Sequence, residues 1–158
     1  MKVEIIKMPV LRSVRNLPLF KEAVEYALPF TGLDADAPGI LQFVMLTRPK
    51  MTELNGLHLH HSGATDVITY DLRDGFAAEF GDEEEILGEI YFCPAVAKEQ
   101  APAFGTSASR ELFLYAVHGM LHLAGEDDLT PEALASMRKA EQRVLAEVEK
   151  KFDLESFF

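Results

Sequence analysis

Residues 109–128 read SRELFLYAVHGMLHLAGEDD, and this stretch decides the fold because it predicts a long helix at the centre of the protein. Thr106 and Ser107, just before it, carry the hydroxyl groups that suit a helix N-cap. Gly125 fits the left-handed position just past a helix end. Most residues between these signals are apolar, so we expect a central helix whose two histidines face a cleft.

The rest of the chain predicts strands and helices around this central helix. Runs rich in apolar and β-branched residues indicate strands over about 2–8 and 40–47, and from 66 and 86 onward. Helical patterns occupy residues 17–28, 50–59, 95–101 and 131–150, with a chain reversal near Asn55-Gly56 or in 60–64. The alternation predicts an α+β fold, a small mixed sheet of about four strands packed with helices, in one domain over residues 1–158.

The composition is that of a soluble globular protein, with 48% hydrophobic and 26% charged residues. Cys93 is the only cysteine, so no intrachain disulfide can form, which favours a cytoplasmic protein. The longest clearly apolar run, residues 40–46, is far shorter than the roughly 20 residues of a membrane span, and the N-terminus lacks a signal-peptide pattern. We therefore expect no membrane association.

The net charge of −11 argues against a protein that coats nucleic acid through a basic surface. Much of this charge is local, because residues 71–85, DLRDGFAAEFGDEEE, hold seven acids and one arginine. This acidic stretch is expected to form an exposed loop between two strands. A polyanionic substrate remains compatible with the sequence if the basic side chains collect on one face.

His118 and His122 are four residues apart, so on a helix they share one face and can reach the same ion. A catalytic zinc site uses three protein ligands and leaves a fourth position for water. The third ligand must then come from outside the helix, and Asp128 follows the turn at Gly125. The alternative is a pair of core histidines without a metal, which the spacing alone leaves open.

The general base of such a site is not evident. The zinc peptidase motif H-E-x-x-H places a glutamate directly after the first histidine, whereas this chain has Gly119 there. A base must therefore come from elsewhere, and Glu89, Glu126 and Asp127 are the candidates. A small peptidase or another hydrolase is supported by the histidine spacing alone.

The stretch HGMLHLAGEDD resembles the H-G-x-L-H-L-x-G-Y-D-H signature of the YbeY family, single-domain metal-dependent endoribonucleases of ribosomal RNA maturation and ribosome quality control. The segments MTELNGLHLHHSGATDVITY, LGEIYFC and SRELFLYAVHG are similar to further blocks of that family. The resemblance implies a zinc ion, one per chain, held by His118, His122 and Asp128. It also implies single-stranded or ribosomal RNA as substrate, ribosomal proteins as partners and no specificity for DNA.

This sequence departs from the family pattern at three positions. Glu126 replaces the tyrosine of the signature, and Asp128 replaces its last histidine. The family's catalytic arginine, counted from Asn55, falls on Leu59. Positive charge could come from nearby histidines or from an arginine after the next strand; these candidates are His58, His60, His61 and Arg73.

Two functions from different classes follow. The first is a zinc-dependent endoribonuclease, with His60, Arg73 and Glu89 as its candidate catalytic residues. The second is a non-catalytic ribosome assembly factor that is stabilised by its metal and binds a ribosomal protein. The lost arginine and the acidic surface favour the second, and the histidine motif favours the first.

Overall fold

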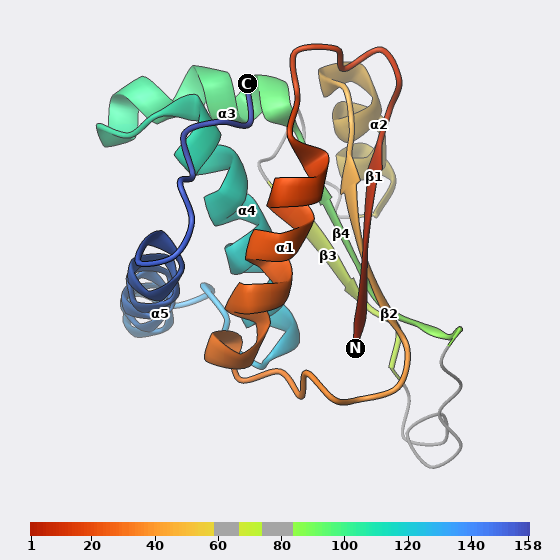
Figure 1. The fold of residues 1–158 in the computed structure, drawn as a ribbon, viewed down its shortest axis with the longest axis vertical. Coiled ribbons are helices and arrows are strands. Elements are labelled where there is room, and N and C mark those ends of the chain that lie inside the picture. The colour runs from red at the N-terminus through yellow and green to blue at the C-terminus, as the bar shows by residue number, and fades with distance from the viewer. Residues whose placement is uncertain (59–66, 74–83) are drawn as a thin grey trace.

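The structure, a computed structural model, describes residues 1–58, 67–73 and 84–158 (Figure 1). Its strands are β1 (Lys2–Lys7), β2 (Ile40–Met45), β3 (Val67–Asp71) and β4 (Ile86–Phe92). Its helices are α1 (Leu17–Ala27), α2 (Arg48–His58), α3 (Pro94–Gln100), α4 (Ala108–Leu123) and α5 (Pro131–Glu149), with short 3₁₀ helices η1 (Leu28–Thr31) and η3 (Ala101–Phe104).

Among the described residues, the strands form one four-stranded mixed sheet in the order β1-β2-β4-β3. β1 pairs with β2 and β2 with β4 in parallel, whereas β3 pairs with β4 in antiparallel orientation. The connection from β1 to β2 runs through α1, as parallel neighbours require. The predicted α+β fold with a small mixed sheet is confirmed.

Helix α4 lies at the centre of the protein, between the sheet and α5 (Figure 1). It contacts β3 and β4 on one side and α1, α3 and α5 on the others. The approach to the sheet is close: a Cβ added to Gly119 would lie 2.5 Å from Cγ2 of Ile90 in β4. A glycine at this position lets α4 pack closely against β4. The predicted central helix is confirmed.

The ends of α4 follow the signals in the sequence. The Ser107 side chain accepts a hydrogen bond from the backbone N–H of Arg110 at 3.0 Å, as an N-cap does. Gly125 has a φ of 108°, and the backbone N–H of Glu126 donates to the Leu121 carbonyl at 3.0 Å. This turn closes α4 and directs the chain back along it.

Two expectations differ from the structure or lie outside its described part. Asn55 and Gly56 lie inside α2, so the chain does not reverse there. Residues on either side of this pair continue the helix, and Met51 in the same helix is fully buried, so packing outweighs the low helix propensity of Asn and Gly. The alternative reversal at 60–64 and most of the acidic stretch, 74–83, fall outside the described residues.

None of the helices in the described ranges is long and apolar enough to cross a bilayer.

Candidate metal centre

His118 and His122 lie one turn apart on α4, and their rings meet edge to face with centroids 4.5 Å apart. The two Nε2 atoms are 3.0 Å apart. Both side chains are partly exposed, and His118 lines a cavity, so the pair does not sit in a dry core. The structure therefore favours a site over a pair of core histidines.

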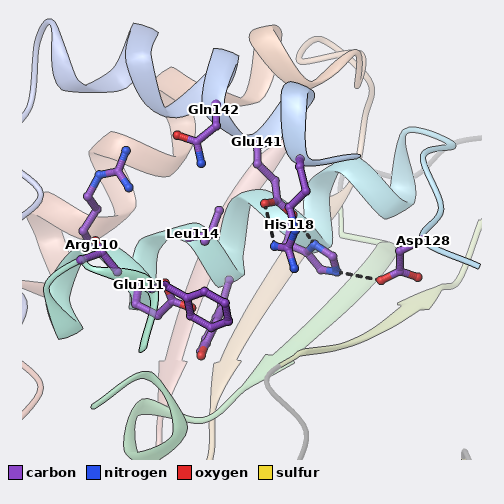
Figure 2. A pocket seen from close by; sticks show the side chains of 11 residues that line it. Arg110, Glu111, Leu114, His118, Asp128, Glu141 and Gln142 are labelled. Carbon is purple, nitrogen blue, oxygen red and sulfur yellow. Dashed lines mark hydrogen bonds and ion pairs between the residues drawn. The ribbon is translucent and has the colours of Figure 1, made fainter. Parts of the chain in front are cut away.

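Asp128 returns to this pair from the turn after α4, and Figure 2 shows its carboxylate on the side of His118. Its Oδ2 atom is 3.7 Å from Nε2 of His118 and 3.8 Å from Nε2 of His122. Ligand atoms about 2.0 to 2.2 Å from a tetrahedral zinc ion lie about 3.3 to 3.6 Å from one another, and the separations of 3.0, 3.7 and 3.8 Å here lie within a few tenths of an ångström of that range. The three side chains form a group that could hold one metal ion.

The neighbouring acids are engaged elsewhere. An oxygen of Glu126 accepts a hydrogen bond from the Ser136 hydroxyl at 3.2 Å. Asp127 Oδ1 accepts from the backbone N–H of Leu129 at 3.1 Å, which is a local turn contact. Of these consecutive acids, Asp128 is the one whose carboxylate faces both histidines.

Each histidine is held by an acceptor behind it. Nδ1 of His118 lies 2.7 Å from Oε1 of Glu141 in α5, and Nδ1 of His122 lies 3.0 Å from the backbone carbonyl oxygen of Glu126. An ionised carboxylate and a carbonyl oxygen only accept, so each Nδ1 carries the proton. In the neutral form of both rings, the two Nε2 lone pairs would face each other, an arrangement that a cation between them would stabilise.

Glu141 is a candidate functional residue that was not singled out from the sequence. Its side chain is 1% exposed, and its second oxygen accepts from Nη1 of Arg138 at 3.2 Å. A buried carboxylate that orients a metal-binding imidazole is a recurrent arrangement in metal sites. A signal was present in the sequence, because Glu141 falls within the apolar stripe of α5 beside Ala140 and Val144.

The protonation of His122 also suits a ligand. Burial lowers the pKa of His122 below its usual 6.5, and the neighbouring His118 lowers it further, while Asp128 opposes the shift. His122 is therefore neutral near pH 7, the form that binds a metal.

A cavity of about 320 Å³, lined in part by His118 and Asp128, opens between α4 and α5 (Figure 2). It runs from His118 and Asp128 along α4 toward Arg110 and Phe104. Two guanidinium groups, those of Arg110 and Arg138, line it, and neither was singled out from the sequence. This volume is within the range of small-molecule sites.

Arg73 lies at the end of α4 and does not line this cavity. Its guanidinium donates to both oxygens of Asp71 and to the backbone carbonyl of Leu123. The hydrogen bond from Arg73 is the main cause of the lowered pKa of Asp71. The arginine therefore caps the carboxyl end of α4 in this structure.

Glu89 is not brought to the histidine pair. A Cβ added to Gly88 would meet Leu123 of α4, and Ile90 meets Gly119, so the side chain between them points to the other face of the sheet. There Glu89 accepts a hydrogen bond from the Tyr91 hydroxyl at 2.9 Å. Burial and this bond raise the pKa of Tyr91 to about 12.

The remaining candidates near Leu59 lie outside the described residues or at their edge. His60, His61 and Leu59 lie outside the described residues, and His58 ends α2. A catalytic role for His60 stays a prediction.

The fold and the site define a class of protein: an α+β domain whose central helix carries two histidines one turn apart, met by an aspartate from the turn that follows. Comparison with known proteins agrees with this class. The family model for Endoribonuclease YbeY matches residues 9–149. The chain belongs to the YbeY family.

Individual relatives share this family name. The chain is 34% identical over 134 residues to a protein named Endoribonuclease YbeY from Elusimicrobium minutum, covering 85% of this chain and 90% of that protein. It is 38% identical over 109 residues to the protein of the same name from Frankia casuarinae, covering 65% of this chain but only 54% of that protein. The solution structure of TM1509 from Thermotoga maritima matches with a TM-score of 0.62 and 25% identity, covering 94% of this chain and 90% of that one.

Proposed function

We propose that this protein is a zinc-dependent endoribonuclease that cuts single-stranded RNA in ribosomal RNA maturation and ribosome quality control, in the cytoplasm. The observation that carries the proposal is the convergence of His118, His122 and Asp128 at the end of a cleft. Membership of a family whose relatives are named Endoribonuclease YbeY supports RNA as the substrate.

The residues fit one zinc ion per chain. His118 and His122 would hold it through Nε2, and Asp128 through its carboxylate. Zinc in such a site supplies a Lewis acid that lowers the pKa of water and polarises a phosphoryl oxygen. Glu141 and the Glu126 carbonyl keep the proton on each Nδ1, so the imidazoles stay oriented toward the ion.

Cleavage is expected to be slow. Leu59 stands where the family's arginine is expected, and loss of one such donor to the transition state typically costs about 10² to 10³ in rate. Asp128 in place of a histidine would leave a bound ion with one less net positive charge, so the ion would lower the pKa of water less. Leu59→Arg should therefore accelerate cleavage unless another cation, such as His60, already fills that role.

The test is metal analysis of the purified chain together with digestion of single-stranded RNA. We expect zinc to co-purify, cleavage to stop when a chelator is added, and activity to be lost in His118→Ala and His122→Ala. Asp127→Ala is the matched control, because its carboxylate bonds only a local backbone N–H. Zinc-loaded protein that leaves RNA intact would contradict the nuclease.

A second candidate is a non-catalytic, metal-stabilised assembly factor that binds a ribosomal protein. The net charge of −11 and Leu59 favour it, because both weaken the attraction of the site for RNA phosphates. It takes precedence if zinc-loaded protein captures purified ribosomal proteins and does not cut RNA.

A further inference from the structure

The cleft beside the metal centre extends well beyond the three converging side chains. Arg110, Leu114 and His118 follow one another at four-residue intervals on α4 and line one wall (Figure 2). At 1.5 Å per residue, Arg110 lies about 12 Å along the helix from His118. A bound strand that reaches from one to the other must therefore span more than the bond being cut.

The far end of the cleft carries an exposed aromatic ring. Phe104, the last residue of η3, is 62% exposed and lines the same cavity as His118. Among the large hydrophobic side chains that are exposed in the described part of the chain, it alone is aromatic. A ring of this kind is a surface on which an unpaired RNA base stacks, whatever the base.

Apart from Asp128 at the metal end, the accessible charged side chains that line the cleft are those of Arg110 and Arg138. Arg110 donates to Glu149 through Nε and one terminal nitrogen, which leaves donors on its other terminal nitrogen. Arg138 is 55% exposed, while its partner Glu141 is 1% exposed. Glu111, the other glutamate of the cavity wall, is also buried. The guanidinium groups, rather than these glutamates, are thus available to a phosphate.

We propose that this cleft holds the nucleotides that adjoin the cleaved bond, with a base stacked on Phe104 and a neighbouring phosphate contacted by Arg110. The inference rests on the proposed function, since it assigns a substrate subsite to the same centre. Arg138 lies at the His118 end of the cleft, where it donates to Glu141, and it would contact the phosphate nearer to the metal centre. The subsite reads no particular base, because every base presents a stacking face.

The test measures binding separately from cleavage. The probe is a short oligouridylate labelled with fluorescein, and its affinity for the full chain is measured by fluorescence anisotropy, both as purified and with chelator to prevent cutting. Phe104→Ala should weaken binding about 5- to 150-fold, the range expected for loss of one base stack. Phe104→Trp should bind like the parent, and so should Val10→Ala, an exposed apolar residue outside the cleft.

The phosphate contact has its own readout, the dependence of affinity on salt. Arg110→Gln should lower the slope of log K against log salt by about 0.7, the value for one phosphate contact on a single strand. Arg12→Gln, which removes the same charge from an exposed site outside the cleft, should leave the slope unchanged. Circular dichroism melting curves establish that the variants are folded.

Each possible outcome either supports or overturns the proposed subsite. Equal affinities for Phe104→Ala and Val10→Ala, or equal salt slopes for Arg110→Gln and Arg12→Gln, overturn the subsite even if the parent cuts RNA. Failure of the parent to bind the oligouridylate overturns it as well. If binding depends on Phe104 and Arg110 but zinc-loaded protein cuts nothing, the subsite stands and the proposed nuclease fails.

Discussion

Replacing Glu141 by glutamine should weaken zinc binding without changing any ligand. The carboxylate lies 2.7 Å from Nδ1 of His118 and also accepts from Arg138. Glutamine has nearly the same shape and keeps one acceptor oxygen. However, it loses the negative charge that strengthens both hydrogen bonds, and its amide N–H₂ cannot accept from Arg138.

The expected size follows from these contacts. A hydrogen bond to a charged group contributes about 1.5 to 3 kcal/mol, roughly twice a neutral one. Losing the charge should therefore cost about 1 to 3 kcal/mol of orientation energy at His118. This corresponds to about a 5- to 150-fold loss, and partners of metal ligands typically contribute 10- to 100-fold to metal affinity.

The assay is competition for zinc with a chromophoric chelator at constant pH. Glu147→Gln is the matched control, since it makes the same change on the same helix at a partly exposed ion pair with Lys150. Its zinc affinity should equal that of the parent. If Glu141→Gln also binds zinc as tightly as the parent while its thermal unfolding is unchanged, Glu141 does not orient the site.

Three further outcomes are expected. Asp128→Ala should lower zinc affinity sharply in the same competition assay, and Asp128→His should restore it. Asp127→Ala should bind zinc like the parent. If all of these variants bind zinc as tightly as the parent, Asp128 is not a ligand. In metal-free protein, the pKa of His122 is lower in the folded state than in the unfolded chain, so its contribution to stability is present above pH 6.5 and is lost as pH falls through the folded-state pKa. The thermal unfolding temperature should therefore fall over this pH range, and His122→Gln should reduce that fall. Gly119→Ala should destabilise the fold by about 1 to 3 kcal/mol in urea unfolding, because its Cβ would overlap Ile90. The control is Gly56→Ala, whose Cβ would meet nothing within 4 Å and which should stabilise α2 by up to about 1 kcal/mol. A stabilised Gly119→Ala variant would show that α4 and β4 are not in close contact.

The features that the sequence predicted well are local. The N-cap at Ser107 and the turn at Gly125 depend on residues within one turn of each helix end, so the bounds of α4 could be predicted. The convergence of Asp128 on the histidines also follows from a short connection, since one turn brings the chain back to the helix it has just left. Such features need no knowledge of how distant elements pack.

The features that were missed depend on packing between distant elements. Glu141 faces His118, and Arg138 contacts Glu141, because α5 packs against α4, and nothing near the histidines in sequence indicates these contacts. Glu89 was selected for its residue type, whereas its position was decided by strand alternation, with Gly88 and Ile90 facing α4. Arg73 shows the same limit, because its position depends on where β3 places it relative to the end of α4.

The departures from the family pattern and the composition of the cleft together determine which groups can attract a polyanionic substrate to the site. With Asp128 as a ligand, the ion is one charge less positive than with a third histidine, and Leu59 supplies no cation. A polyanion approaching a chain of net charge −11 must then be attracted by groups close to the site. Among the described residues that line the cleft, Arg110 and Arg138 carry that charge. Their loss should therefore weaken RNA binding more in this protein than it would beside an intact family arginine.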